Sequence, residues 1–293
     1  MTNSKIKLPN YGGQALIEGV LMRGKKNVSA SFRLPDGTIK TVSEPLKGIY
    51  TKGLFKIPFI RGLLLLWDSL VLGMNYLTIS ANEQTKSDEK IEGPTLILTV
   101  IFSLIVSVAI FFVAPAAISR WLGGLFDWKP IWINLLEGFI RLSLILIYLW
   151  AISFMPDIKR VFQYHGAEHK TINAFEAGSD LNKEDVMKYS TQHPRCGTSF
   201  LLTVVVMSIL LFSLMGKLTF LWTIISRIVL IPVIAMVAYE YIRLMSRFLN
   251  STIVKTLFWP NLALQKLTAY QPSIDMVEVA ISAFKRMQEE EAK

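Results

Sequence analysis

The sequence predicts an α-helical polytopic membrane protein, with about four transmembrane helices, one interfacial helix and a small β-rich N-terminal domain. Three observations support this fold class. Hydrophobic residues make up 52% of the 293-residue chain, several long segments carry no charge, and basic residues are distributed unevenly between those segments. An average soluble domain has fewer apolar residues and lacks such uncharged segments. We therefore expect most of the helices to lie in lipid.

Residues 1–58 are expected to form a β-rich cytoplasmic domain. The segment ALIEGVLMRG, residues 15–24, has the composition of a single strand that ends at a glycine. Apolar and polar residues alternate on both sides of Pro35-Asp36-Gly37, which is a turn signal. Two further strands joined by this turn are therefore predicted.

The first 62 residues carry most of the net charge of the chain. They contain eleven lysines and arginines against three acidic residues, and the whole chain has a net charge of +9. Cations beside a membrane commonly contact anionic lipid headgroups. RNA is the alternative, but basic and aromatic residues do not alternate here as they do in single-strand binders. We expect lipid headgroups as partners, leave a protein partner open and do not expect nucleic acid.

Residues 59–94 are expected to form an interfacial or re-entrant helix followed by a linker. The segment 59–80 is apolar enough to span. If it crossed, however, the basic residues before it would lie outside, and Asp68 and Asn75 would lie at membrane depth. A helix in the interface, with its apolar face in lipid, avoids both costs. The polar segment 80–94 ends in Gly-Pro and is predicted to be the linker.

Four segments between residues 95 and 242 are expected to span the membrane. Each is close to the roughly 20 residues that a helix needs to cross the hydrocarbon core. They are residues 95–119, 131–154, 198–216 and 220–239. Glu137 and Arg141 lie at i and i+4 in the second span, so we expect them to neutralise each other. Arg227 of the fourth span is a further candidate member of this polar patch.

The distribution of basic residues predicts the orientation. With the amino terminus in the cytoplasm, 26 lysines and arginines lie inside, and only Arg120, Lys129 and Lys217 lie outside. We therefore expect a multi-pass protein of the cytoplasmic (inner) membrane with both termini in the cytoplasm. The loop 155–197 and the tail 243–293 then lie inside. The tail is expected to be mostly helical and amphipathic, interrupted by FWPNLALQKLTAYQP, which begins at residue 258.

The loop 155–197 contains all three histidines and the single cysteine. Apolar residues recur at helical spacing from residue 157 to 177, and Gly178 is a natural stop. His165 and His169 lie on the same stripe, so the imidazoles are expected to face whatever the helix packs on. A further short helix is predicted in NKEDVMKYS, residues 182–190.

His165, Glu168 and His169 match the pattern H-x-x-E-H of inverted zincins. Imidazoles at i and i+4 lie one turn apart on a helix, close enough to share one ion. In such sites the histidines hold zinc, and the glutamate takes a proton from a water whose pKa the metal lowers. Zinc is therefore the expected cofactor, with another divalent metal as an option. The alternative is that the histidines only form hydrogen bonds.

The remaining metal ligands are open at the level of sequence. Glu176 lies on the same face as His169 but about 10 Å further along a continuous helix, so it is better placed to orient a ligand or bind a second ion. His193 and Cys196 lie in a loop that can fold back over the helix. With His165 and His169 they would form a closed structural zinc site, whereas three of the four plus water would form an open one. Cys196 as a nucleophile with His193 as its base is a separate possibility.

Three segments carry a resemblance to a known family: YGGQALIEGVLMRG at 11–24, FQYHGAEHKTINAFEAG at 162–178 and HPRCGTSFL at 193–201. Together, and in this order, they resemble the bacterial YqhQ-like membrane protein family, a domain of unknown function. The resemblance covers nearly the whole chain. It implies a predicted metal-dependent membrane enzyme of the bacterial inner membrane, with no substrate assigned.

The resemblance also directs attention to further residues of these segments. They are Gln14, Glu18, Met22, Arg23, Arg195, Thr198 and Ser199. Glu18 could supply a missing carboxylate ligand or a base if the β domain docks over the histidine helix.

We therefore predict a metal-dependent membrane enzyme. As an enzyme, its expected reaction is hydrolysis of a lipid or a membrane-associated peptide. Glu168 and Glu18 are the candidate catalytic residues. The candidate metal ligands are His165, His169, His193, Cys196 and Glu176. The alternative is a non-catalytic membrane scaffold, in which a structural metal or a hydrogen-bonded histidine cluster pins the loop and the basic domain recruits a partner.

Overall fold

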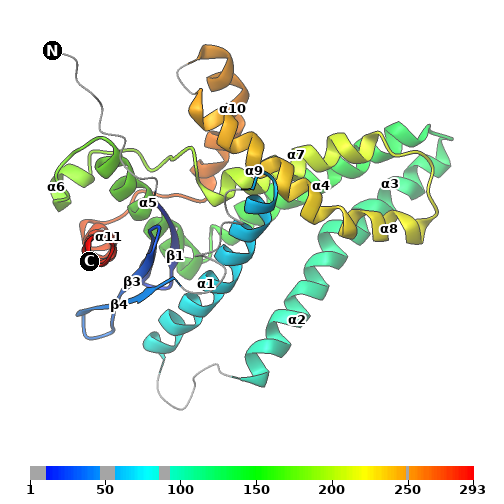
Figure 1. Ribbon diagram of the computed structural model, residues 1–293. Helices are drawn as coiled ribbons and strands as arrows, with labels where there is room; N and C mark the ends of the chain where they lie inside the picture. The colour runs from blue at the N-terminus through cyan, green and yellow to red at the C-terminus, as the bar shows by residue number, and fades with distance from the viewer. Residues whose placement is uncertain (1–10, 47–56, 86–92, 249–250) are drawn as a thin grey trace.

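A computed structural model describes residues 11–46, 57–85, 93–248 and 251–293. Residues 1–10 and 47–56 of the predicted domain 1–58, and residues 86–92 of the linker predicted at 80–94, lie outside these ranges. The molecule is elongated, with the sheet, α5, α6 and α11 at one end and α3 and α8 at the other (Figure 1). The mostly helical composition and the small N-terminal sheet agree with the predicted fold class.

The sheet is a four-stranded antiparallel meander in the order β1-β2-β3-β4. Its strands are Gly12–Leu16, Gly19–Arg23, Asn27–Arg33 and Ile39–Pro45. The turn predicted at Pro35-Asp36-Gly37 is present between β3 and β4, where Gly37 has a φ of 86°. The single strand predicted at 15–24 is wrong. Leu16 pairs with Gly19 across a turn made by Ile17 and Glu18, so this segment bends into a hairpin.

The sheet is buried on both faces. Helix α1 (Ile60–Gln84) covers one face, and α5 (Pro156–Glu176) and α11 (Ile274–Ala292) cover the other. Successive side chains of strand β2 point to opposite faces of the sheet. Val20 and Met22 belong to the apolar cluster with α5 and α11, and Leu21 belongs to the cluster with α1. The C-terminal helix therefore completes the core of an N-terminal sheet.

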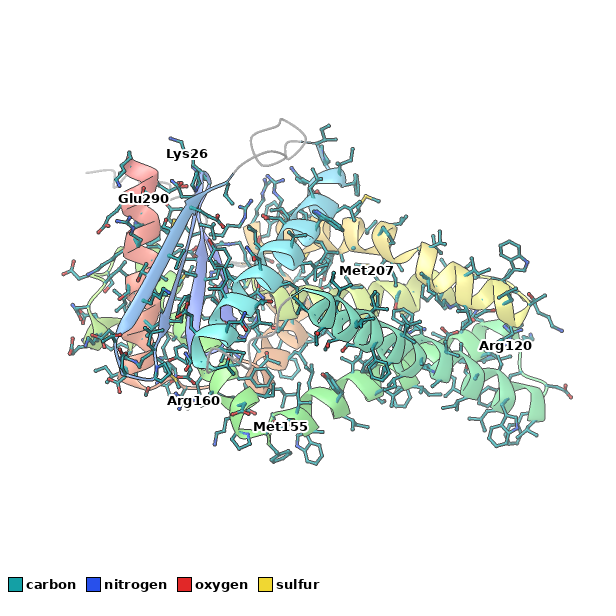
Figure 2. The ribbon with its side chains drawn as sticks, turned by 90° about the horizontal axis from the view of Figure 1, so that it is seen from below. Lys26, Arg120, Met155, Arg160, Met207 and Glu290 are labelled. Carbon is teal, nitrogen blue, oxygen red and sulfur yellow. The ribbon has the colours of Figure 1, made fainter. Side chains whose placement is uncertain are left out.

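The remaining long helices form an apolar bundle, here called the helical arm. Its members are α2 (Pro94–Val108), the π-helical turn η4 (Ala109–Val113), α3 (Ala114–Leu125), α4 (Pro130–Ile152), α7 (Gly197–Ser213), α8 (Phe220–Val229) and α9 (Ile231–Arg247). Helix α7 packs on α4 and α9. Figure 2 shows Arg120 at the end of the arm farthest from Lys26 and the sheet.

Within the described ranges, three helices are long and apolar enough to cross a membrane: α1, the continuous helix 95–125, and α4. Helices α8 and α9 pass the same test together but are bent by 43°, which gives up to four candidates. Helix α7 has 17 residues and is a shorter apolar helix. The segment expected to lie in the interface thus also has the length and composition of a span, while its second half packs on the sheet.

Polar side chains inside the arm pair as the sequence predicts. Glu137 accepts hydrogen bonds from Arg141 Nη2 at 2.6 Å and from Arg227 Nε and Nη2, both at 2.9 Å. Arg141 Nε also donates to the carbonyl of Phe111 in η4, at 2.9 Å. This hydrogen bond joins α4 to the π-helical turn.

Two element ends differ from the predictions. Helix α1 continues to Gln84, so residues 80–84 are helical rather than part of the linker. The interruption predicted from residue 258 begins later, because α10 (Thr252–Leu264) runs through Pro260 and is followed by η5 (Gln265–Leu267). Phe258, Asn261 and Leu264 are buried in α10, and this packing holds the helix together beyond the proline.

Candidate metal centre

Helix α5 positions the histidines. It runs from Pro156 to Glu176, close to the predicted 157–177, and Gly178, two residues beyond its end, has a φ of 72°. The short helix predicted nearby is α6 (Lys183–Val186). Helix α5 is wedged between β1, β2 and α11, so its central residues are buried.

The two imidazoles on α5 are held by backbone carbonyls. His165 Nδ1 lies 2.7 Å from the carbonyl oxygen of Thr268, and His169 Nδ1 lies 2.5 Å from that of Thr191. A carbonyl can only accept, so each Nδ1 carries the proton, and in the neutral ring Nε2 has a free lone pair. Ligand histidines in metal sites are oriented in the same way by a carbonyl or carboxylate. The ring centroids are 4.3 Å apart.

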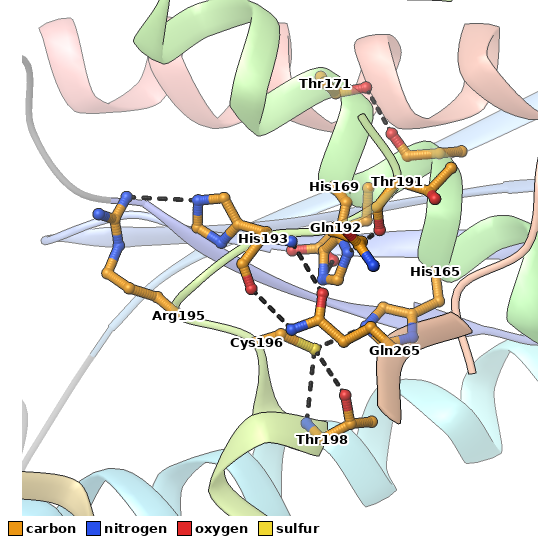
Figure 3. Close-up of polar contacts among 12 residues, drawn as sticks. His165, His169, Thr171, Thr191, Gln192, His193, Arg195, Cys196, Thr198 and Gln265 are labelled. Atoms are coloured by element: carbon orange, nitrogen blue, oxygen red, sulfur yellow. Dashed lines mark hydrogen bonds and ion pairs between the residues drawn. The ribbon is translucent and has the colours of Figure 1, made fainter. Parts of the chain in front are cut away.

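Cys196 brings a third donor atom to these rings. Its Sγ lies 3.1 Å from His165 Nε2 and accepts from the N–H of Thr198, at the first turn of α7 (Figure 3). One ligand atom from each of His165, His169 and Cys196 lies within 4.8 Å of the other two. Two imidazole nitrogens and a sulfur form a donor set that suits zinc, and three protein ligands leave a coordination position open.

Glu168 lies beside this cluster. Its Oε2 is 3.4 Å from His169 Nε2, and the residue is 4% exposed. Gly13 of β1 makes room for it, because a Cβ there would lie 2.6 Å from Glu168 Cγ. Burial raises the pKa of the Glu168 carboxyl to about 7, although His165 opposes this shift.

His193, Glu176 and Arg195 form a separate polar group next to the cluster. His193 Nε2 lies 3.5 Å from Glu176 Oε2, and Arg195 forms an ion pair with the same carboxylate. The ring of His193 is near that of His169, with centroids 5.7 Å apart, but no nitrogen of His193 joins the three-atom group. Burial lowers the pKa of His193. Burial alone would raise the pKa of Glu176, but the hydrogen bond with His193 and the charge of Arg195 outweigh it, so the pKa of Glu176 is lowered. The structure brings Cys196, rather than His193, to the two histidines.

The sheet docks on α5, which was the condition for a role of Glu18 at the site, yet Glu18 lies elsewhere. It occupies the β1–β2 turn with a φ of 52°, where Arg160 Nη2 donates to its Oε2 at 2.5 Å and the hydroxyl of Tyr164 donates to the same oxygen at 3.2 Å. The hydrogen bond from Arg160 is the main reason that the pKa of Glu18 is lowered. The residue of β1 that touches Glu168 is Gly13, and Glu18 instead anchors the hairpin to α5.

Other residues of the three segments hold elements together. Gln14 packs against Gly73 of α1, and Arg23 Nε lies 2.5 Å from Asp68 Oδ2 of the same helix. Ser199 accepts a hydrogen bond from Gln265 at 2.8 Å. These contacts join the sheet to α1 and the start of α7 to the C-terminal region.

Sequence reasoning missed the groups that hold the loop in place. Gln265 binds the backbone of His193 twice, since its Oε1 accepts from the N–H at 2.8 Å and its Nε2 donates to the carbonyl at 2.9 Å. The carbonyls of Thr191 and Thr268 fix the imidazoles. Backbone carbonyls leave no sequence signal, and Gln265 lies about 70 residues beyond the loop.

Comparison with known proteins agrees with the resemblance. Residues 57–290 match the family model described as "Protein of unknown function (DUF1385)". The chain is 32% identical over 300 residues to "Uncharacterized protein YqhQ" of Bacillus subtilis (strain 168), and the alignment covers 97% of this chain and 94% of that protein. No solved structure matches the chain.

Proposed function

Because the chain belongs to the DUF1385 family, whose description assigns no activity, we propose a function from the site itself: a metal-dependent membrane enzyme with zinc as its cofactor. One observation carries this proposal. Two imidazoles with carbonyl-bound Nδ1 atoms and one cysteine sulfur converge within 4.8 Å. Hydrogen bonding alone would not require the single cysteine and two oriented Nε2 atoms to meet at one point.

In this proposal His165, His169 and Cys196 would hold the metal, and Glu168 would be the general base. Zinc with three protein ligands binds a water and lowers its pKa toward neutrality. The Glu168 carboxylate, 3.4 Å from His169 Nε2, would be the group that accepts a proton from such a water. The reaction class is hydrolysis. In this proposal Glu176 and Arg195 do not bind the metal. They hold the loop in place through the contact of Glu176 with His193.

We place the site at the cytoplasmic face of a bacterial inner membrane, with the substrate a lipid or a membrane-associated peptide. Cys196 immediately precedes the apolar helix α7, and α5 begins four residues after α4 ends, so the cluster adjoins the helical arm. Exposed aromatic side chains lie near both ends of the arm, as is typical of membrane interfaces. They are Tyr148, Trp150 and Phe154 near the sheet, and Trp121, Phe126, Trp132 and Trp222 at the far end.

The N-terminal region is proposed to contact anionic lipid. Several cations of the sheet are engaged within the protein: Arg23 with Asp68, Arg33 with Glu278, and Lys40 with Glu83. The exposed Lys25 and Lys26, between β2 and β3, are the described cations for which we propose headgroup contact. Helix α1 is proposed to lie at the interface, since it exposes Trp67 and Leu70 while its other face packs on the sheet.

The burial of the cluster favours a second candidate function. Glu168, His169 and Cys196 are 4%, 1% and 6% exposed, which suits a structural metal as well as a catalytic one. The cluster also connects α5, the start of α7 and the segment after η5. In this alternative the metal pins the loop of a membrane scaffold.

Metal content tests the proposal. The full chain is purified in detergent without chelators, and zinc per chain is measured by mass spectrometry. We expect about one equivalent in the wild type and near none in His169→Ala or Cys196→Ala, while circular dichroism still reports folded helices. His193→Ala is the matched control, because this ring lies outside the three-atom group, and it should retain the metal. A wild type free of bound metal would refute the proposal.

Chelation separates the two candidate functions. An open site exchanges its metal while the fold persists, whereas removal of a structural zinc lowers stability greatly. We expect the thermal midpoint to change by only a few degrees when zinc is stripped, and zinc to rebind on addition. Unfolding upon chelation would favour the scaffold with a structural metal.

A further inference from the structure

A second polar site lies at the far end of the helical arm. A cavity of about 400 Å³ lies between the end of α3, the start of α4, the 214–218 connector and α8. Its lining contains the cations Arg120, Lys217 and Arg227 and a single carboxylate, that of Asp127. Cavities of this size hold small ligands.

The part of the arm other than α9 carries an excess of positive charge. Residues 94–154 and 197–230 contain five cations, and their only carboxylates are Asp127 and Glu137. Glu137 is shared by two guanidinium groups, those of Arg141 and Arg227, and all three side chains are at most 3% exposed. A buried cation without a matching anion is costly in an apolar setting. An anion in the cavity would offset this excess.

The guanidinium of Arg227 forms the inner wall of the cavity, and one of its nitrogens has weak partners. Arg227 Nε and Nη2 bind Glu137 and Asn134, and the guanidinium lies 4.1 Å from the centroid of the Phe212 ring. Among the described residues, the hydrogen-bond partners of Nη1 are the sulfur of Met215 at 3.3 Å and the hydroxyl of Ser226 at 3.5 Å. Sulfur is a weak acceptor and the second contact is long. Arg120 is held at the cavity by hydrogen bonds of 2.6 Å to Thr223 and to the carbonyl of Leu218.

We propose that this cavity binds a phosphate-bearing anion, with Arg120, Lys217 and Arg227 as the cations that receive it. Guanidinium and ammonium groups are the usual phosphate ligands of proteins. Trp128 also lines the cavity, and the exposed Trp132 and Trp222 lie at the same end of the arm. Tryptophan is enriched at the level of lipid headgroups, which makes an anionic lipid one source of the phosphate. A free phosphate compound carries the same group and is the other source. This site is independent of the metal centre.

Binding to the full chain in detergent tests the proposal and separates the two sources. The first experiment measures binding of radiolabelled inorganic phosphate by equilibrium dialysis. The second experiment titrates phosphatidylglycerol or phosphatidylcholine and counts the retained lipids by native mass spectrometry. Saturable inorganic phosphate binding would identify a free phosphate compound. Retention of phosphatidylglycerol over phosphatidylcholine, without inorganic phosphate binding, would identify the lipid headgroup.

Two variants with the same charge loss decide whether the cavity is responsible. Lys217→Gln should weaken binding about three- to tenfold, because a charge-assisted hydrogen bond is lost, and Lys217→Arg should restore it. Lys129→Gln removes a cation from the neighbouring loop, outside the cavity lining, and should bind as the wild type does. Absence of binding to the wild type, or equal weakening by the two glutamine variants, would overturn the proposal. The zinc content of all variants should match that of the wild type, whichever result the metal tests give.

Discussion

At the scale of single residues, the candidate centre depends on close contact between Glu168 and the sheet. Gly13 faces the carboxylate, and a Cβ built there lies 2.6 Å from Glu168 Cγ and 2.7 Å from both Glu168 Oε1 and the carbonyl of Leu21. One of these atoms belongs to the backbone and cannot move cheaply. Any side chain at this position would therefore push Glu168, together with α5, away from β1.

We expect Gly13→Ala to lower the free energy of unfolding by about 1–3 kcal/mol, as overpacking of a tight core does. The measurement is denaturant unfolding of the purified protein followed by tryptophan fluorescence. Gly12→Ala is the control, since a Cβ at Gly12 meets nothing within 4 Å, and we expect a change within about 0.5 kcal/mol. Equal stability of the two variants would contradict the described contact.

The residues of the centre were predictable in part. His165, Glu168 and His169 come from one helix, where the i and i+4 spacing determines which side chains meet. The choice between His193 and Cys196 depended on the path of a loop, and that path is set by Gln265 and by backbone carbonyls. Glu18 shows the same limit, because neither the docking of the sheet on α5 nor the ion pair of Glu18 with Arg160 could be derived from the sequence.

At the scale of elements, the C-terminal helix covers most of one face of the sheet. Helix α11 packs on β2, β3 and α5, and Phe284 is fully buried among Tyr11, Phe175 and its other neighbours. The amphipathic pattern of the tail predicted a buried face but not its partner, because periodicity reports which face is apolar and not what covers it. The β1–β2 hairpin was missed for a different reason. Its turn, Ile17-Glu18, lacks the glycine or asparagine that usually marks a two-residue turn.

We expect Phe284→Ala to destabilise the protein by about 3–5 kcal/mol, since it removes a large side chain from the core between α11 and the sheet. Lys285→Ala changes the next residue of the same helix, which is exposed, and should have little effect. Thermal unfolding of both variants in the same detergent gives the comparison. A small effect of Phe284→Ala would mean that α11 is not part of the folded core.

At the scale of the whole molecule, a polar end and an apolar arm divide the chain by composition. The polar end, which holds the sheet, α5, α6 and α11, is built from both ends of the sequence and from the loop between α4 and α7 (Figure 1). Hydropathy predicted that the segments of the arm are long apolar helices, because the segments carry long runs of apolar residues. It did not predict that the segment expected to span at 220–239 divides into α8 and α9, which are bent by 43°. It could not decide the role of α1, which has the length and composition of a span and also packs on the sheet.

Orientation is the prediction that belongs to this scale. The distribution of basic residues predicts that the loop 217–219 lies outside the cytoplasm and the sheet inside. Lys217→Cys should therefore react with a membrane-impermeant maleimide in intact cells, and Lys25→Cys should react only after the cells are made permeable. The wild type is the background control, since Cys196 is its only cysteine and is buried. Labelling of Lys25→Cys in intact cells, with protection of Lys217→Cys, would invert the topology and place the candidate metal centre on the outer face.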